Sequence, residues 1–201
     1  MKLLWSLASE LYSDLIIGGL EFPPPKFLFN KPKGQLECVY SDTILADVNF
    51  PDNERKMILE ANKDLEYFCN GAITLDIRFE LDSEDIETVR QNCVLLRVSA
   101  SHPAIKESDE KIQNTTLGLC DYMQNDTRRL YLVPERLTNP ITYRTTAIHE
   151  LGHFIGLSHI ERPSIMYRHN YSRVLYPTYK DAQEFARVWN YKPEQFRYFK
   201  L

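Results

Sequence analysis

Three histidines and a glutamate are concentrated in residues 149–159, which read HELGHFIGLSH. The histidines are His149, His153 and His159, and Glu150 directly follows the first of them. Residues four apart on a helix project from one face, so His149 and His153 can both reach one metal ion. Imidazole nitrogens are common zinc ligands. The stretch therefore predicts a zinc site whose first two ligands lie one helical turn apart.

His159 is the predicted third ligand, although a straight helix would carry it away from the first two. Gly156 lies between His153 and His159 and is one of only 7 glycines in the chain. Glycine tolerates the left-handed conformation that ends helices, so the chain can turn at Gly156 and bring His159 back. Three protein ligands leave a position for water, as in catalytic zinc sites. A structural zinc site is the main alternative, but no fourth Cys or His lies near the motif.

Glu150 is rotated by about 100° from His149 on a helix, so we expect it beside the metal and facing a bound water. Zinc would lower the pKa of that water toward about 7 and polarise a scissile carbonyl. Glu150 is the predicted general base, which takes the proton and returns it to the leaving amine. Two other functions stay open: a zinc-binding peptide-recognition module without turnover, and a zinc peptidase whose third ligand is the downstream Glu184.

The length, composition and charge of the chain limit the classes of protein to which it can belong. The 201 residues are 43% hydrophobic and 26% charged, which suits one soluble domain or one catalytic unit of two small lobes. The net charge is −4 and the basic residues are scattered, so no nucleic-acid partner is indicated. No apolar run approaches the roughly 18 residues of a membrane span. The 4 cysteines have no C-x-x-C pairing, and their disulfide state is left open.

Apolar runs rich in β-branched and aromatic residues, one of them (72–81) strictly alternating, predict the strands together with turn signals. They are expected at residues 43–50, 72–81, 93–100, 116–123 and 128–133, with a hairpin turn at 124–127 between the last two. Apolar residues at three- and four-residue spacing predict the helices. Helices are expected at 52–70, from Pro140 through the histidine motif, after Thr178 with a capping box to Asp181, and within residues 1–19 before a Pro-rich connector. The polar stretch 101–115 is expected to be a surface loop.

The motif HELGHFIGLSH, followed by SIMY at 164–167, resembles the metzincin clan of zinc endopeptidases, most closely its matrixin-like branch. The resemblance implies one catalytic Zn²⁺ with Glu150 as the base, and it leaves open a structural Ca²⁺ or a second Zn²⁺. Met166 is similar to the methionine of the turn that packs beneath the metal without binding it. The implied zinc ligands are His149, His153 and His159.

The resemblance also implies an α+β fold. A twisted mixed β-sheet with a backing helix and the active-site helix would precede a small C-terminal lobe with the Met-turn and a terminal helix. Residues 1–35 are then an N-terminal helix and a Pro-rich connector, and residues 36–201 are the catalytic domain. Its upper lobe covers about 36–157 and its lower lobe about 158–201.

An edge strand in this family holds the substrate extended above the zinc, and residues 116–123 occupy the matching place. Leu117, Gly118 and Leu119 are therefore candidates for main-chain pairing with a peptide. The pocket for the residue after the cut bond is expected to be walled by residues 167–178. The expected partner is a peptide or protein substrate, bound in a cleft of a monomer. The family default implies secretion, although residues 1–19 resemble a signal peptide only superficially.

Overall fold

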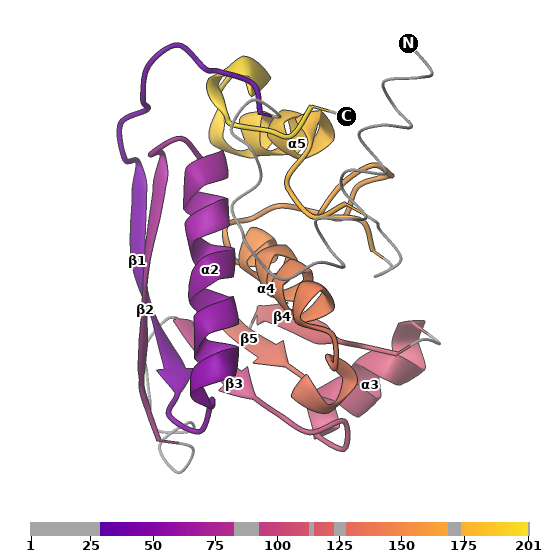
Figure 1. Ribbon diagram of the computed structural model, residues 1–201. Coiled ribbons are helices and arrows are strands. Elements are labelled where there is room, and N and C mark those ends of the chain that lie inside the picture. The colour runs from indigo at the N-terminus through magenta and orange to yellow at the C-terminus, as the bar shows by residue number, and fades with distance from the viewer. Residues whose placement is uncertain (1–28, 83–92, 113–114, 123–127, 169–173, 201) are drawn as a thin grey trace.

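The computed structural model describes residues 29–82, 93–112, 115–122, 128–168 and 174–200. The predicted N-terminal helix, the Pro-rich connector and the hairpin turn at 124–127 lie outside these residues. Figure 1 shows a sheet with helices packed on its faces and the C-terminal helix beyond its end. No helix in the described ranges is long and apolar enough to cross a membrane.

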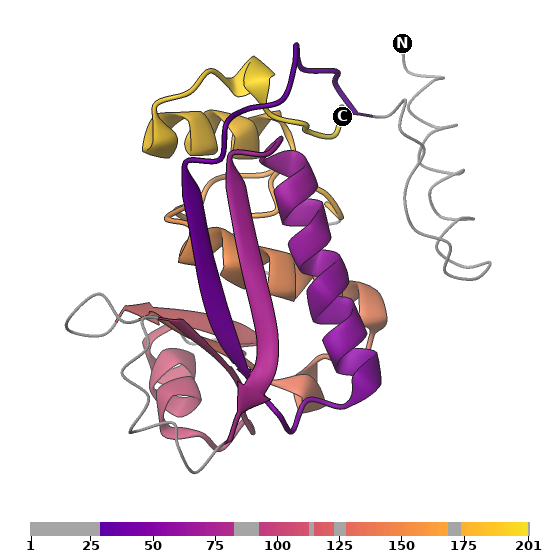
Figure 2. The same cartoon turned by 90° about the vertical axis from the view of Figure 1, so that its left-hand side faces the viewer.

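A mixed five-stranded sheet forms the scaffold of the molecule, with the strand order β2-β1-β3-β5-β4. The first four strands in this order run parallel to their neighbours, and β4 is antiparallel to β5 at one edge. Figure 2 shows the strong twist between β1 and β2 and the other strands. The mixed sheet and the α+β class agree with the predicted fold. The strands are β1 (Tyr40–Asp47), β2 (Ile73–Leu81), β3 (Cys93–Arg97), β4 (Gly118–Tyr122) and β5 (Arg128–Leu132).

The first strand begins and ends three residues earlier than predicted. Its end is fixed by a turn at Asp47, where the Asp47 carboxylate accepts a hydrogen bond from the Asn49 N–H (2.8 Å) and its carbonyl accepts one from Phe50. Local side-chain bonding of this kind competes with the sheet ladder. Val48 to Phe50 are therefore a connection to the next helix, despite their strand-like composition.

The pleat of the sheet sends alternate residues to two different cores. In β3 and β5, Leu95 and Leu130 belong to the large core, whereas their neighbours Val94 and Tyr131 belong to a smaller core on the other face. The large core is covered by α2 (Asp52–Phe68) and α4 (Pro140–Phe154), which lie side by side in Figures 1 and 2. The helix α4, which carries the first two histidines of the motif, is thus packed on both α2 and the sheet.

The prediction of a loop at 101–115 was wrong for most of that segment, because α3 (Pro103–Ile112) covers the smaller core. The helix buries Ile105 completely and places Ala104 against the smaller core, while most of its other residues are polar. Its polar face includes an i,i+4 ion pair between Glu107 and Lys111. Few of its residues are apolar, so the segment reads as a polar loop in the sequence although it packs on the sheet.

The C-terminal part of the chain forms α5 (Tyr179–Trp189). Short 3₁₀ helices lie between β5 and α4 at Pro134–Arg136 and after α5 at Pro193–Gln195. The predicted capping box is confirmed, since Asp181 accepts from the Thr178 N–H at 2.7 Å and Thr178 caps the helix. Asn190 ends α5 with a left-handed φ of 58°. The 3₁₀ helices were not predicted.

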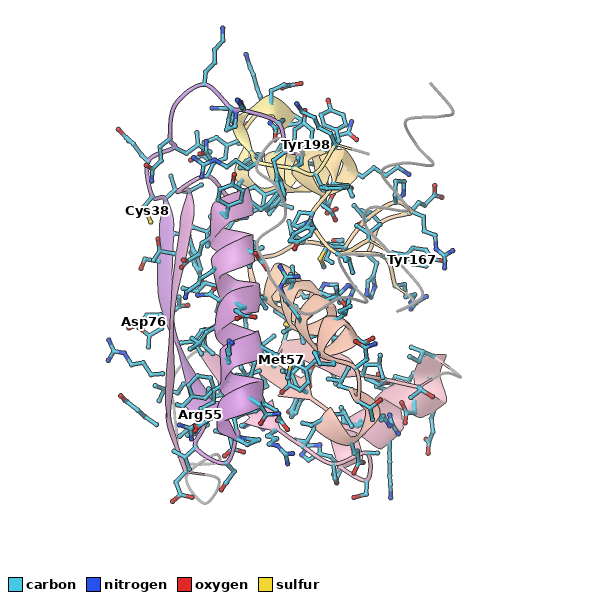
Figure 3. All side chains as sticks on the ribbon, viewed as in Figure 1. Cys38, Arg55, Met57, Asp76, Tyr167 and Tyr198 are labelled. Atoms are coloured by element: carbon cyan, nitrogen blue, oxygen red, sulfur yellow. The ribbon has the colours of Figure 1, made fainter. Side chains whose placement is uncertain are left out.

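All four cysteines are free. Cys93 and Cys69 are buried in the large core, as expected of small hydrophobic thiols. Cys38 is exposed, and its thiol contacts the Tyr40 carbonyl and the Thr74 hydroxyl. Figure 3 shows Cys38 beside the start of β1, on the opposite side of the molecule from Tyr167, so Cys38 lies away from the histidine motif.

Candidate metal centre

The helix α4 carries the first two histidines and is fixed at both ends. Its start is capped by Asn139, whose side-chain oxygen accepts from the Ile141 N–H at 2.8 Å, and Pro140 occupies the first turn. Ile148 and Phe154 are completely buried in the large core. Burial of this face leaves His149 and His153 on the side of α4 that borders a surface pocket.

The chain leaves α4 through Gly156, which has a left-handed φ of 93°. The Gly156 N–H donates to the His153 carbonyl at 2.8 Å, and the Leu157 N–H donates to the Gly152 carbonyl at 3.0 Å. A residue with a Cβ atom is strained at such a φ. Gly156 therefore provides the turn that directs the following residues back toward α4, and His159 comes to lie beside the first two histidines.

Three side chains from other elements satisfy the last carbonyls of α4 at residues 153–155. The Tyr122 hydroxyl from β4, the Arg128 guanidinium from β5 and the Trp189 indole from α5 each donate to one of these carbonyls in turn. A helix end leaves such groups without intrahelical partners. The sheet and the C-terminal helix together fix the point where the helix that carries His149 and His153 ends.

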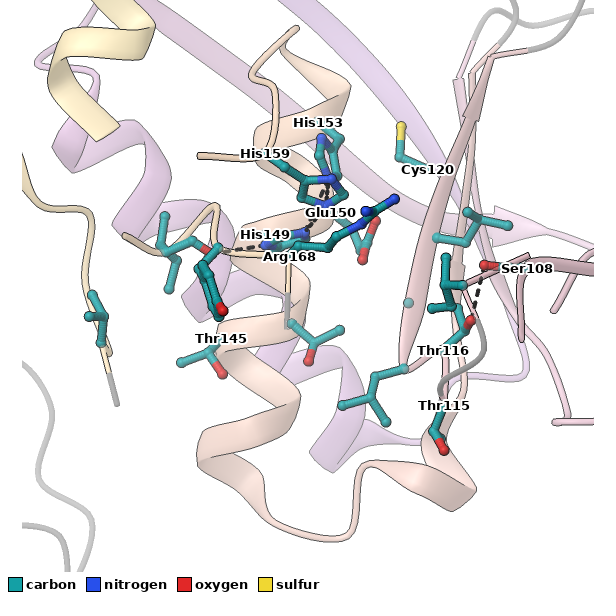
Figure 4. A pocket seen from close by; sticks show the side chains of 18 of the residues that line it. Ser108, Thr115, Thr116, Cys120, Thr145, His149, Glu150, His153, His159 and Arg168 are labelled. Carbon is teal, nitrogen blue, oxygen red and sulfur yellow. Dashed lines mark hydrogen bonds between the residues drawn. The ribbon is translucent and has the colours of Figure 1, made fainter. Parts of the chain in front are cut away.

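The Nε2 atoms of the three histidines converge on one point (Figure 4). The distances are 3.1 Å between His153 and His149, 3.2 Å between His149 and His159, and 3.0 Å between His153 and His159. No other group of three or more potential ligands is brought together among the described residues. The structure thus brings the three predicted ligands together, with His149 and His153 before the turn at Gly156 and His159 after it.

The tautomers of two rings show why this arrangement suits a cation. The His149 Nδ1 donates to the Ile165 carbonyl and the His153 Nδ1 donates to the Leu157 carbonyl, both at 2.8 Å. A neutral ring with its proton on Nδ1 presents a lone pair at Nε2. These lone pairs face each other and cannot hydrogen-bond, so the donor set fits a zinc ion.

Burial keeps these imidazoles neutral. The pKa of His149 is lowered to about 3, mainly by burial and to a smaller extent by the neighbouring His153 ring. Burial also lowers the pKa of His153. Because a metal ligand must be deprotonated, rings that resist protonation are ready to bind a cation at neutral pH.

Glu150 points into the same pocket and is only 6% exposed. Burial raises the pKa of its carboxyl to about 8. A cation held by the three imidazoles would oppose this shift, because an opposite charge favours the ionised carboxylate. The backbone of β4 abuts this residue: a Cβ atom at Gly118 would lie 2.7 Å from Glu150 Cγ and 2.8 Å from Oε1.

The turn that carries Met166 links the first and third histidines. The Ile165 carbonyl accepts from His149, and the Met166 carbonyl accepts from the N–H of Ile160, the residue after His159, at 3.1 Å. The Met166 side chain is completely buried. The turn therefore orients two ligands through its main chain, while Met166 packs in the core.

Asp181 fixes this turn from the first turn of α5. Its carboxylate accepts from the Ser164 hydroxyl at 2.6 Å and from the backbone N–H groups of Ile165 and Met166, each at 3.2 Å. Sequence reasoning assigned Asp181 only to the capping box with Thr178. The signal for its second role was weak, because a capping box by itself needs no distant partner.

The pocket in front of the histidines has a volume of about 290 Å³. Its walls include Leu117, Gly118 and Leu119, the predicted peptide-pairing residues, on one side. Tyr167, Arg168 and Val174 lie in the predicted wall segment and also line the pocket. The sequence did not single out Arg168 as a residue of the cleft.

Glu184, the alternative third ligand, lies outside the histidine cluster. Its carboxylate accepts from the Ser158 N–H at 3.3 Å and pairs with Arg187 at 2.7 Å. Both partners lower the pKa of Glu184, with Arg187 contributing most. Glu184 thus supports the backbone next to His159 and is not one of the converging ligands.

Comparison with known families agrees with this geometry. No individual curated protein matches the sequence. The sequence pattern of the matrixin family matches residues 43–186. These residues begin within β1, end within α5 and include the whole histidine motif. This match covers more than half of the chain, and the matrixins are zinc metalloproteases. The chain therefore belongs to the matrixin family.

Proposed function

We propose that this chain is a zinc endopeptidase that hydrolyses internal peptide bonds of an extended substrate. The carrying observation is the convergence of three imidazole Nε2 atoms, 3.0–3.2 Å apart, in a pocket that also holds the buried carboxylate of Glu150. His149, His153 and His159 would hold the ion. When bound, zinc supplies Lewis-acid chemistry, which polarises a carbonyl and makes water more acidic.

Glu150 moves the proton in this proposal. Its carboxylate accepts the proton of the attacking water and passes it to the amine that leaves, so one residue serves as base and then as acid. Its position supports this role, because the Glu150 side chain lines the same pocket as the three histidines. General acid–base catalysis of this kind contributes about 10²–10⁴ in rate.

The edge strand β4 is the proposed platform for the substrate. Its inner side pairs with β5, and none of the described strands pairs with its outer side. An extended peptide can add to such an edge through its main chain, and Leu117 to Leu119 would supply the pairing groups. Because Gly118 abuts Glu150, a peptide at this edge would pass close to the base.

The test is cleavage of a diverse peptide library by the parent chain and by Glu150→Gln, each with and without a zinc chelator. We expect internal cleavage by the parent that the chelator removes. Glu150→Gln should bind zinc and cut at least about 10²-fold more slowly, since the general base is lost. A peptide-binding module without turnover would instead bind library members and cut none of them.

A further inference from the structure

One cationic side chain reaches the pocket of the histidine cluster. Arg168 follows Tyr167 and lines the pocket together with His149 and Glu150. Figure 4 shows its side chain extending from the Met-turn side across the pocket, toward the strand that carries Cys120. Arg168 is thus placed where a bound peptide would pass between this wall and β4.

Arg168 forms no ion pair with the described residues that line the pocket. It is the only lysine or arginine among the described residues that line the cleft, and Glu150 is the only aspartate or glutamate among them. Glu150 is buried, whereas Arg168 is exposed, and burial alone shifts the pKa of Glu150, with no contribution from Arg168. No hydrogen bond or ion pair connects Arg168 to any other described residue either.

Other arginines near the site are engaged, which sets Arg168 apart. Arg128 donates to the Phe154 carbonyl at the end of α4. Arg162 stacks over the Tyr167 ring, with its guanidinium carbon 4.5 Å from the ring centroid, and is not a lining residue. Arg168 is therefore a guanidinium that is available to a ligand in the cleft.

A guanidinium presents several N–H donors in a planar fork, which matches the two oxygens of a carboxylate. A peptide can offer a carboxylate close to the cut bond in two ways: an Asp or Glu side chain, or a free C-terminus. We propose that Arg168 selects peptides that carry a carboxylate next to the scissile bond. This inference rests on the proposed endopeptidase function.

The experiment compares kcat/KM for matched peptide sets. In the first set the residue directly before or directly after the cut bond is Glu, Gln or Lys, and all C-termini are amides. In the second set Gln follows the cut bond, and the peptide ends shortly after it as a free acid or an amide. The first set reports a side-chain carboxylate and the second a terminal one. Each set is cut by the parent, Arg168→Gln, Arg168→Glu and Arg162→Gln.

We expect the parent to favour the carboxylate over its neutral counterpart by about tenfold to one hundredfold in at least one set, the range for one hydrogen bond to a charged group. Arg168→Gln should bring this ratio close to one, and Arg168→Glu should favour Lys over Glu. Arg162→Gln makes the same change of charge outside the pocket and should keep the parent's ratio. Added salt should reduce the ratio in the parent, since the contact is partly exposed.

Two results would overturn the inference alone: chelator-sensitive cleavage with a ratio near one in both sets, or a ratio that Arg168→Gln leaves unchanged. A loss of the preference in Arg162→Gln as well would assign it to the overall charge rather than to Arg168, and would also overturn the inference. No cleavage of any peptide, including the neutral ones, would overturn the proposed function and the inference with it.

Discussion

Gly152 leaves the space that Met166 occupies. A Cβ atom at Gly152 would lie 2.4 Å from the Met166 Sδ atom and 3.1 Å from its Cε atom. Gly152 lies inside α4 beside His153, and Met166 is completely buried. The glycine in the H-E-L-G-H sequence therefore allows the turn that orients the first and third histidines to pack directly against the active-site helix.

Gly152→Ala should destabilise the protein, in contrast to the usual effect of this change. In a typical helix interior Ala is more favourable than Gly by about 1 kcal/mol. Here the added methyl overpacks the core, which costs about 1–3 kcal/mol. We expect a net loss of stability in thermal unfolding of the metal-free chain.

The double variant Gly152→Ala/Met166→Ala tests the contact itself. Removing the Met166 side chain beyond Cβ relieves the clash, so the double variant should lose less stability than the two single variants together. Strict additivity of the two single effects would show that the methyl group and the thioether do not meet.

His159→Ala should lose zinc, whereas Glu184→Ala should keep it. Two imidazoles alone would hold the ion weakly, and a ligand that binds only the folded state contributes about 2.7 kcal/mol at one hundred times its Kd. Each kcal/mol shifts the Tm of a domain of this size by roughly 2–4 °C. His159→Ala should therefore melt several degrees below the zinc-loaded parent and gain little from added zinc.

Atomic absorption on the purified variants measures the zinc content. Glu184→Ala removes only a bond to the Ser158 N–H and the pair with Arg187, so its zinc content should equal that of the parent. Zinc lost from Glu184→Ala but retained by His159→Ala would assign the third ligand to the glutamate.

Asp181→Asn should destabilise both the fold and the metal centre. The carboxylate accepts from the Ser164 hydroxyl, from two backbone N–H groups of the Met-turn and from Thr178. Hydrogen bonds to a charged group are worth about 1.5–3 kcal/mol each, and an amide cannot accept all of them with both of its ends. We expect a drop in Tm of several degrees and weaker zinc binding, measured by competition with a chelator.

Ser164→Ala is the graded control for Asp181→Asn. It removes one of the donors and leaves the carboxylate bonded to the backbone of Ile165 and to Thr178. Its Tm should lie between those of the parent and Asp181→Asn. An Asp181→Asn variant with the parent's Tm and zinc affinity would show that the hydrogen bonds of Asp181 do not hold the Met-turn.

The ion pair between Asp109 and Arg136 should contribute acid-dependent stability. Arg136 holds the pKa of Asp109 below its ordinary value through a 2.8 Å hydrogen bond, and the Thr116 N–H adds to this shift. Because the folded pKa is the lower one, the unfolded chain takes up the proton first as pH falls. The contribution is present above the unfolded pKa of about 3.9 and is lost as the pH falls through the folded pKa.

Urea unfolding of the parent and Asp109→Asn at neutral pH and near pH 3.5 measures this contribution. Asp109→Asn should be less stable at neutral pH and should lose less stability on acidification. Glu110→Gln is the matched control on α3, because Glu110 forms no ion pair with the described residues. Equal acid sensitivity of all three chains would contradict the role of the Asp109–Arg136 pair.

The sequence by itself determined the features that depend on short-range rules. The four-residue spacing of His149 and His153 places them on one helix face, and the left-handed turn at Gly156 needs a glycine. The capping box of Thr178 and Asp181 starts α5, and alternating apolar residues mark β2. Each of these follows from backbone geometry within a few residues, so it is visible in the order of residue types.

Only the tertiary structure decided which distant residues meet. Ile105 of the largely polar helix α3 packs on the sheet, and Gly152 matters only because Met166 returns to it. Asp181 reaches the Met-turn, and Arg168 enters the cleft, through the path of the chain between separate elements. Such contacts depend on how helices and strands pack against each other. Packing joins residues far apart in sequence, and no local pattern along the chain specifies their partners.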